Sequence, residues 1–343
     1  MSPDTETVAF PNVVPAAREK SLHRRATLML FLATVFWSIS FPLAKAVEAG
    51  QRLVLPEAST WFLAAICVVF RFGIAALVLT VLNARTLRDL TRGELGQGIG
   101  LGAFAGTAIL LQNDGLLHTS ASTSAFLTSC YCVLIPLFIA LRVRRLPGIP
   151  ILVSCALVMA GMIVLSGFNW HTFRLGRGEF ETMVCSIFFT GQILLLGRES
   201  ARNYHAGRVT IVMFATIACI SVVAILPSVE HVNDLALALQ GPVVMGSLLI
   251  LTFACTLLTF GLMNKWQKHL SATEAGLIYC VEPVWTSLFA LFLPGWLGAL
   301  GGFSYPNEKV TSAMLIGGGL ITVANVLLQT LPQSRPAKAV AEV

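Results

Sequence analysis

Four ionisable residues lie inside long apolar stretches of the sequence: Lys45, Arg71, Asp114 and Glu282. If these stretches cross a membrane, an unpaired charge there costs about 2.5–3.5 kcal/mol or more, so each of the four is expected to bind something. Glu282 could bind a proton or the cationic group of a ligand. Alternatively, Glu282 could form an ion pair with Arg71 that only holds helices together. A second structural pair would join Lys45 to Asp114, unless Lys45 extends to the membrane interface.

Aromatic and amide side chains occur in the same stretches. Cavities that bind small ligands combine aromatic walls with a few polar groups. The candidate walls are Trp37, Tyr131, Tyr279 and Trp285, and the candidate polar groups are Gln112, Asn113 and Gln192. The aromatic residues could equally be core packing, and the sequence leaves that alternative open.

Three prolines predict helix breaks close to these residues: Pro42, Pro136 and Pro283, which directly follows Glu282. Proline cannot donate a hydrogen bond to the carbonyl four residues before it, so each one frees a carbonyl inside an apolar stretch. Such carbonyls are tolerated only where protein or a wet cavity satisfies them. The prolines therefore outline a polar cavity between helices.

The apolar stretches themselves predict an all-α polytopic membrane protein. Apolar residues make up 56% of the 343 residues and charged residues 12%, with a mean hydropathy of +0.79. Runs of about 20 apolar residues are typical of membrane-spanning helices. Ten such runs are present, at 27–47, 60–82, 97–117, 121–141, 148–167, 180–198, 208–228, 242–263, 272–293 and 311–331. Residues 1–26 and 332–343 are expected to be tails.

The basic residues predict the orientation of these spans. Of the 23 Lys and Arg residues, four fall in loops on the side opposite the N-terminus, namely Arg52, Arg174, Arg177 and Lys309. Lys45 and Arg71 lie inside spans, and all the others lie on the side of the N-terminus. Cytoplasmic loops carry the excess of positive charge in membrane proteins. Both termini are therefore expected in the cytoplasm, with the chain in the plasma membrane, or the inner membrane of a bacterium.

An internal repeat divides the chain into two halves. The segment HTSASTSA at 118–125 recurs as HLSATEA at 269–275, 151 residues later, and each leads into a span with an internal proline. Five helices separate the copies, so the two halves, 27–168 and 178–331, are expected to have inverted topology. Inverted repeats with interrupted helices are the architecture of secondary transporters.

Several motifs together resemble the drug/metabolite transporter superfamily, and specifically its ten-helix EamA-type permeases, over about residues 27–331. They are Trp37-Ser-Ile-Ser-Phe-Pro42-Leu-Ala-Lys45, Arg71-Phe72, Gln112-x-x-Gly115-Leu116-x-x-Thr119-Ser120-Ala121-Ser122, Pro136 and Glu282-Pro283. The resemblance implies a carrier of small metabolites, often amino acids or their relatives, that usually moves them outward. Two features depart from the family. The stretch after the ninth helix is longer, with Glu308 displaced, and Asp114 has no family position to carry over.

Other classes of function find little support in the sequence. The eight cysteines lie within spans and form no C-x-x-C pair, so no metal site is expected. The glycines of GQGIGLGAFAG, residues 96–106, are expected to pack helices, and no Walker-type loop is present. We therefore expect no cofactor, catalytic residue or nucleic-acid partner. The predicted function is secondary transport of a small-molecule substrate across a lipid bilayer, with a proton as a candidate coupling ion; a flippase for lipid-linked substrates or a transporter-derived sensor is the alternative.

The orientation gives a direct test. A reporter fused after Val343 should lie in the cytoplasm, and a cysteine replacing Ser304 should be labelled by a membrane-impermeant reagent from outside. Labelling of that cysteine from the cytoplasmic side alone would contradict both the number of spans and the inverted repeat.

Overall fold

The computed structural model describes residues 16–119, 121–165 and 176–330, and within them every regular element is a helix. The first half contains α1 (Ala16–Val54), α2 (Thr60–Leu82), α3 (Arg92–His118), α4 (Ala121–Thr128), α5 (Tyr131–Val143) and α6 (Ile149–Leu165). The second half contains α7 (Arg177–Leu196), α8 (Ala206–Ile225), α9 (Val232–Leu237), α10 (Pro242–Thr252), a π-helix (Phe253–Leu258), α11 (Thr259–Trp266), α12 (Ala272–Tyr279), α13 (Glu282–Ala290), α14 (Leu293–Gly301) and α15 (Ser312–Thr330). Single 3₁₀ turns lie at Thr86–Asp89, Glu199–Ala201, Leu226–Ser228 and Gln267–His269.

Seven helices in the described residues are long and apolar enough to cross a membrane. They span Lys20–Val54, Thr60–Leu82, Arg92–His118, Thr123–Val143, Arg177–Leu196, Ala206–Ser228 and Pro242–His269. The pair Ala272–Ala290 and Leu293–Gly301, bent by 53°, is an eighth if it forms one span. The apolar helices at Ile149–Val164 and Ser312–Leu327 are shorter. The fold is that of a multi-pass helical membrane protein, and seven to eight of the ten expected spans meet this criterion.

Polar residues fix where several of these helices begin. Thr91 and Glu94 form a capping box at the start of α3, and Ser271 and Glu274 form another at the start of α12. In a capping box each side chain satisfies a backbone N–H group that the helix leaves free. Glu94 also accepts hydrogen bonds of 2.9 and 2.7 Å from the guanidinium of Arg208, at the start of α8. The same carboxylate thus begins one helix and joins it to another.

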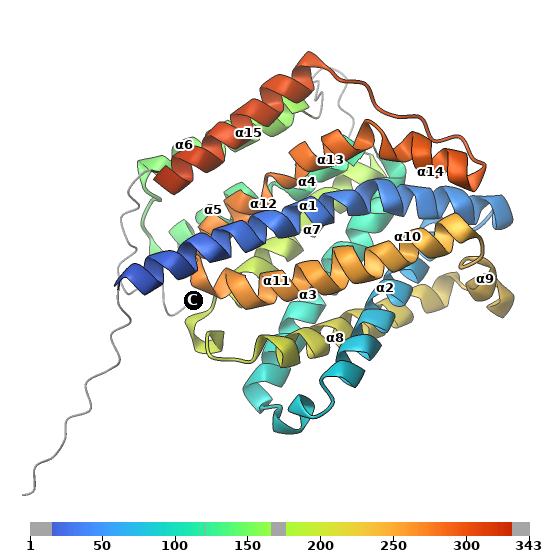
Figure 1. Ribbon diagram of the computed structural model, residues 1–343, viewed down its shortest axis with the longest axis horizontal. Coiled ribbons are helices and arrows are strands. Elements are labelled where there is room, and N and C mark those ends of the chain that lie inside the picture. Colours follow the sequence, from blue (N-terminus) through green and yellow to red (C-terminus); the bar gives the residue numbers. More distant parts are fainter. Residues whose placement is uncertain (1–15, 120, 166–175, 331–343) are drawn as a thin grey trace, which may run out of the picture.

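Helix α3 packs between α7 and α8, while α6 and α15 lie side by side along one edge of the bundle (Figure 1). The contact of α3 with α8 depends on small residues. A Cβ atom on Gly102 would lie 2.7 Å from the carbonyl oxygen of Met213. Gly98 and Gly102, two of the glycines expected to pack helices, do so here because they let two backbones approach closely, whereas nothing lies within 4 Å of a Cβ atom at Gly96.

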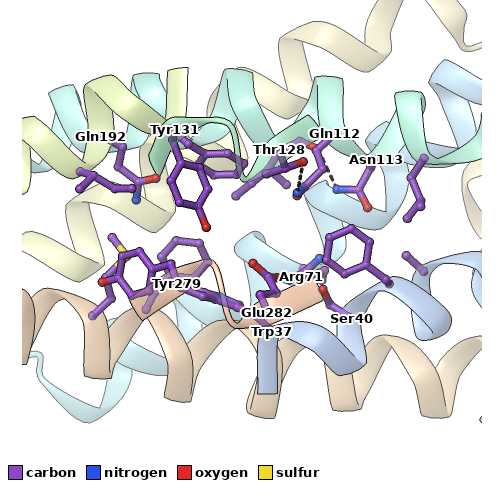
Figure 2. A pocket seen from close by; sticks show the side chains of 18 residues that line it. Trp37, Ser40, Arg71, Gln112, Asn113, Thr128, Tyr131, Gln192, Tyr279 and Glu282 are labelled. Atoms are coloured by element: carbon purple, nitrogen blue, oxygen red, sulfur yellow. Dashed lines mark hydrogen bonds between the residues drawn. The ribbon is translucent and has the colours of Figure 1, made fainter. Parts of the chain in front are cut away.

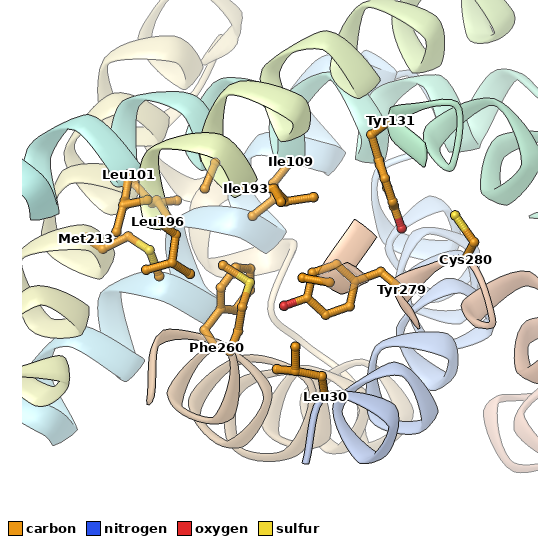
Figure 3. Close-up of a cluster of buried hydrophobic side chains, with 14 of the residues drawn as sticks. Leu30, Leu101, Ile109, Tyr131, Ile193, Leu196, Met213, Phe260, Tyr279 and Cys280 are labelled. Carbon is orange, nitrogen blue, oxygen red and sulfur yellow. The ribbon is translucent and has the colours of Figure 1, made fainter. Parts of the chain in front are cut away.

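Aromatic rings dominate the centre of the bundle. Phe72, Phe214 and Phe260 meet edge to face, with ring centroids 5.5–5.9 Å apart. Trp37 continues this arrangement, 5.4 Å from Phe260 and 5.3 Å from Tyr279. Figure 3 shows Phe260, Tyr131 and Tyr279 among the buried hydrophobic side chains of the core. Edge-to-face packing is favourable beyond area burial alone, so the aromatic core also fixes the walls of the space beside it.

The helix interruptions differ from those expected at two of the three prolines. Helix α1 continues through Pro42, and Pro136 lies inside α5, six residues after the break at 129–130. A membrane helix can lose one backbone bond and continue when neighbouring groups satisfy the freed carbonyl. Of the three prolines, only Pro283 lies directly at an interruption. Helix α12 ends at Tyr279, α13 begins at Glu282, and Pro283 is the second residue of α13.

The contact between α6 and α15 can be tested with one methyl group. A Cβ atom on Gly161 would lie 2.7 Å from the carbonyl oxygen of Gly317, so Gly161→Ala should force the two helices apart. Overpacking of this kind costs about 1–3 kcal/mol. We expect a lower midpoint of thermal unfolding for the purified protein.

Gly73→Ala is the matched control. Nothing lies within 4 Å of a Cβ atom at that position in α2, so this variant should keep or raise the midpoint. Equal midpoints for the two variants would show that α6 and α15 do not meet as described.

Candidate functional site

A cavity of about 70 Å³ lies near the middle of the bundle, which is room for a few water molecules. Figure 2 shows its side chains in two facing rows, one carried by α3, α4, α5 and α7 and the other by α1, α2, α12 and α13. Eight of the residues expected to form a site line it: Trp37, Arg71, Gln112, Asn113, Tyr131, Gln192, Tyr279 and Glu282. They come from segments as much as 245 residues apart, as Trp37 and Glu282 illustrate.

Arg71 supplies the cavity with a buried cation. Its side chain projects from α2 and the residue is only 5% exposed. The Nε atom donates a hydrogen bond of 3.0 Å to Thr256 Oγ1. Within the described residues no carboxylate lies within ion-pair distance of the guanidinium, so the expected Arg71–Glu282 pair is not formed.

The π-helix places Thr256 for this contact. Its hydroxyl donates a hydrogen bond of 2.8 Å to the carbonyl of Leu251. Leu251 lies five residues earlier, which agrees with the wider turn of a π-helix. π-bulges are rare and are frequently found at functional sites. No pattern in the sequence marks this segment, so Thr256 was not among the predicted site residues.

Glu282 supplies the acidic group as the first residue of α13. A helix N-terminus favours negative charge, because the free N–H groups and the helix dipole point toward it. The Ser38 hydroxyl lies 2.9 Å from the backbone carbonyl of Glu282 and joins α1 to the break. No residue in the described part of the chain hydrogen-bonds the Glu282 carboxylate.

Amide side chains line the wall opposite Glu282. Gln112 donates a hydrogen bond of 3.2 Å to Thr128 Oγ1, and Asn113 donates one of 2.7 Å to the carbonyl of Ile109. Gln192 is 1% exposed, and its Nε2 atom is buried without a partner among the described residues. Leaving a buried donor unsatisfied costs about 1–3 kcal/mol, so this amide favours an acceptor in the cavity.

Tyr279 closes one end of the cavity. Its hydroxyl donates a hydrogen bond of 2.9 Å to Gln267 Oε1. Gln267 Nε2 in turn donates a hydrogen bond of 2.9 Å to the carbonyl of Ile193. Gln267 has no solvent exposure. Three elements, α12, the turn after α11 and α7, are thereby joined across the bundle.

Three expected site residues lie outside the cavity. Trp285 packs against Phe31 and Phe289, with ring centroids 6.0 and 6.5 Å away, because the break before α13 directs Glu282 inward and Trp285 toward α1. The expected Lys45–Asp114 pair is also wrong. Lys45 donates a hydrogen bond of 3.0 Å to the carbonyl of Thr119, and Asp114 forms its ion pair with Arg177.

The cavity also contains residues that were not among the predicted site residues. Ser40, Phe41, Ala44 and Leu116 belong to the quoted motifs, whereas Ile109, Thr128, Phe189, Ile193, Phe260 and Met263 lie outside them. Helical spacing from Trp37 would have found Ser40, Phe41 and Ala44, which follow it at intervals of three, four and seven residues. Phe260 and Met263 follow the π-helix, whose extra residue per turn changes the face they present.

Comparisons with known proteins agree with this arrangement. Residues 24–167 match the model of the EamA-like transporter family. A protein of Archaeoglobus fulgidus described as an uncharacterized transporter is 24% identical over 266 residues, which cover 78% of this chain and 77% of that protein.

The fold is similar to that of a known crystal structure, with a TM-score of 0.61 at 19% identity; the match covers 89% of this chain and 96% of the other. At that identity the likeness concerns the fold alone. Together with the family match over residues 24–167 and the transporter relative, the apolar helices around a polar cavity support a membrane transporter of the EamA type.

Proposed function

We propose that the protein is a secondary transporter that moves small zwitterionic metabolites, amino acids or their relatives, outward by alternating access through the central cavity. The observation that carries this proposal is that Arg71 and Glu282 line one cavity without pairing with each other. A ligand with an anionic and a cationic group would pair with both.

Energetics favour such a ligand over an empty site. Unpaired ionisable groups at membrane depth cost several kcal/mol, and water in a small cavity compensates them only in part. A carboxylate near Arg71 and an ammonium near Glu282 would replace that water. The free donor of Gln192 and the rings of Trp37 and Tyr279 would then contact the rest of the ligand.

Contacts at the helix breaks support two inverted repeats. The sulfur of Cys280 lies 3.6 Å from the carbonyl oxygen of Ser129, and these residues are 151 positions apart, the spacing of the repeated sequence segment. Equivalent positions of two repeats touch each other when they lie on a two-fold axis. Inverted repeats that meet at interrupted helices are typical of transporters that alternate between two open states.

The orientation we propose places ten spans in the membrane with both termini in the cytoplasm. The end of the bundle that holds Thr119 and Gly176, here called the outer end, then faces outside. The bonds of Tyr279 and Gln267 lie toward the other end, while the cavity extends toward the outer end as far as Ala44 and Leu116. A cavity closed on one side agrees with alternating access.

Counterflow in proteoliposomes tests the function. Vesicles loaded with single amino acids or related metabolites should take up the labelled compound in a saturable way. A flippase or sensor of the same fold would give no counterflow of any soluble metabolite.

The roles of the two charges can be separated with amide variants. Glu282→Gln and Arg71→Gln should each lower transport roughly ten- to a hundredfold, since a hydrogen bond to a charged group contributes about 1.5–3 kcal/mol. The double variant should remain inactive, because each charge serves the substrate. Recovery of transport in the double variant would instead support a structural ion pair in another state of the cycle.

Thr256 should act through Arg71. Thr256→Val removes the hydroxyl that holds Nε, and we expect a KM raised about tenfold or more, because the lost bond is to a cation. Thr252→Val is the matched control, since the Thr252 hydroxyl donates its hydrogen bond, of 2.7 Å, to the carbonyl of Leu248 in its own helix. Initial rates against substrate concentration decide the outcome, and equal KM values for both variants would contradict the role of Thr256.

A further inference from the structure

A second charge cluster lies outside the cavity, at the outer end of α3 and α7, with buried carboxylates and a half-exposed Arg177. Asp114 on α3 has no solvent exposure, and its Oδ2 atom accepts a hydrogen bond from Arg177 Nη2. Arg177 also donates from Nε to Glu181 Oε1 at 2.8 Å, so one guanidinium serves two carboxylates. Both carboxylates therefore lie within hydrogen-bond distance of the same guanidinium.

Each carboxylate keeps one oxygen that nothing satisfies. Asp114 Oδ1 and Glu181 Oε2 are both buried without a hydrogen-bond partner among the described residues. Two ionised carboxylates beside one cation would leave a net negative charge in the bundle as well as two orphaned acceptors. Two carboxylates that lie close together can avoid this by sharing one proton, because each negative charge disfavours ionisation of the other.

The surrounding groups do not supply an alternative partner. His118 on α3 forms a hydrogen bond of 2.9 Å with Thr60 of α2. Glu179 on α7 accepts a hydrogen bond of 2.6 Å from the Thr119 hydroxyl. On α1, Lys45 is bound to the Thr119 carbonyl. Among the described charged groups facing this cluster, Arg177 alone contacts the two carboxylates.

We propose that Asp114 and Glu181 form a proton-binding site, in which one shared proton joins α3 to α7 and lets the pH outside control closure of the outer end. This proposal rests on the transport function proposed above and adds to it the position of a proton site separate from the substrate cavity. The proton binds between Asp114 Oδ1 and Glu181 Oε2, and its release to water leaves both groups as carboxylates.

Helix packing explains how one proton could move the outer end. A Cβ atom on Gly178 would lie 2.7 Å from the carbonyl oxygen of Gly115, so α3 and α7 touch through their backbones beside the two carboxylates. Loss of the shared proton places two negative charges at this contact and pushes the helices apart. Asp114 follows Gln112 and Asn113 of the cavity directly, so the separation would open the cavity on this side.

Glu181→Gln is the decisive variant. The amide of glutamine can donate permanently to Asp114 Oδ1 and so imitates the protonated acid without titrating. Infrared spectra of the full-length protein in lipid should show a protonated-carboxyl band at neutral pH in the wild type. This band should be lost in Glu181→Gln and in Asp114→Asn. The control is Glu57→Gln, an exposed acid in the loop at the same end, which should keep the band.

Transport provides the second measurement. With the internal pH fixed, the wild-type rate should change up to about tenfold per unit of external pH, as binding of one proton allows. Glu181→Gln should lose that dependence and remain active.

Several results would overturn the proton site. These are an unchanged band in both variants, an unchanged pH slope in Glu181→Gln, or failure of Glu181→Gln to fold, since a donor at this position should preserve the contact. If instead no metabolite shows counterflow, the transport proposal fails while the infrared result still decides whether the proton is present.

Discussion

Arg71 and Glu282 face one small cavity as separate charges, and the protein compensates each of them with an irregularity in a helix. The π-helix at 253–258 turns Thr256 toward the guanidinium. The break at 280–281 begins a new helix at Glu282, where the free N–H groups stabilise a carboxylate. A regular helix in either place would offer neither contact. The irregular segments therefore follow from the need to hold two opposite charges apart at membrane depth.

The two halves of the protein contribute differently to the cavity. On the proposed repeat, Glu282 corresponds to Tyr131, and Tyr279 corresponds to Thr128, in each case 151 positions apart. The backbone interruptions are alike, but only the second half places a carboxylate at its break. The first half contributes a phenol there, and amides from α3. If the two halves are repeats as proposed, equivalent breaks carry different groups, which would orient a ligand whose two ends differ in charge.

The sequence predicted the helical membrane fold and part of the cavity wall, because apolar runs and helical spacing depend on local chemistry. Eight expected residues line the cavity. Ion pairing was predicted poorly, since it depends on which helices approach closely. Lys45 and Asp114 lie at similar positions along their helices, yet the close contact of Gly115 and Gly178 brings Arg177 to Asp114 instead. The π-helix could not be predicted either, because its extra residue reflects tertiary contacts.

Helix α3 links the two charged sites of the molecule. Gln112 and Asn113 face the cavity, while the next residue, Asp114, is directed toward α7 and Arg177. Because helices are stiff over one turn, a shift of α3 against α7 at the outer end must also displace the cavity amides. Lys45 extends this connection to α1 through the Thr119 carbonyl, so three of the helices that surround the cavity meet at one point. If a ligand binds in the cavity and a proton in the outer cluster as proposed, adjacent residues of α3 would connect the two sites.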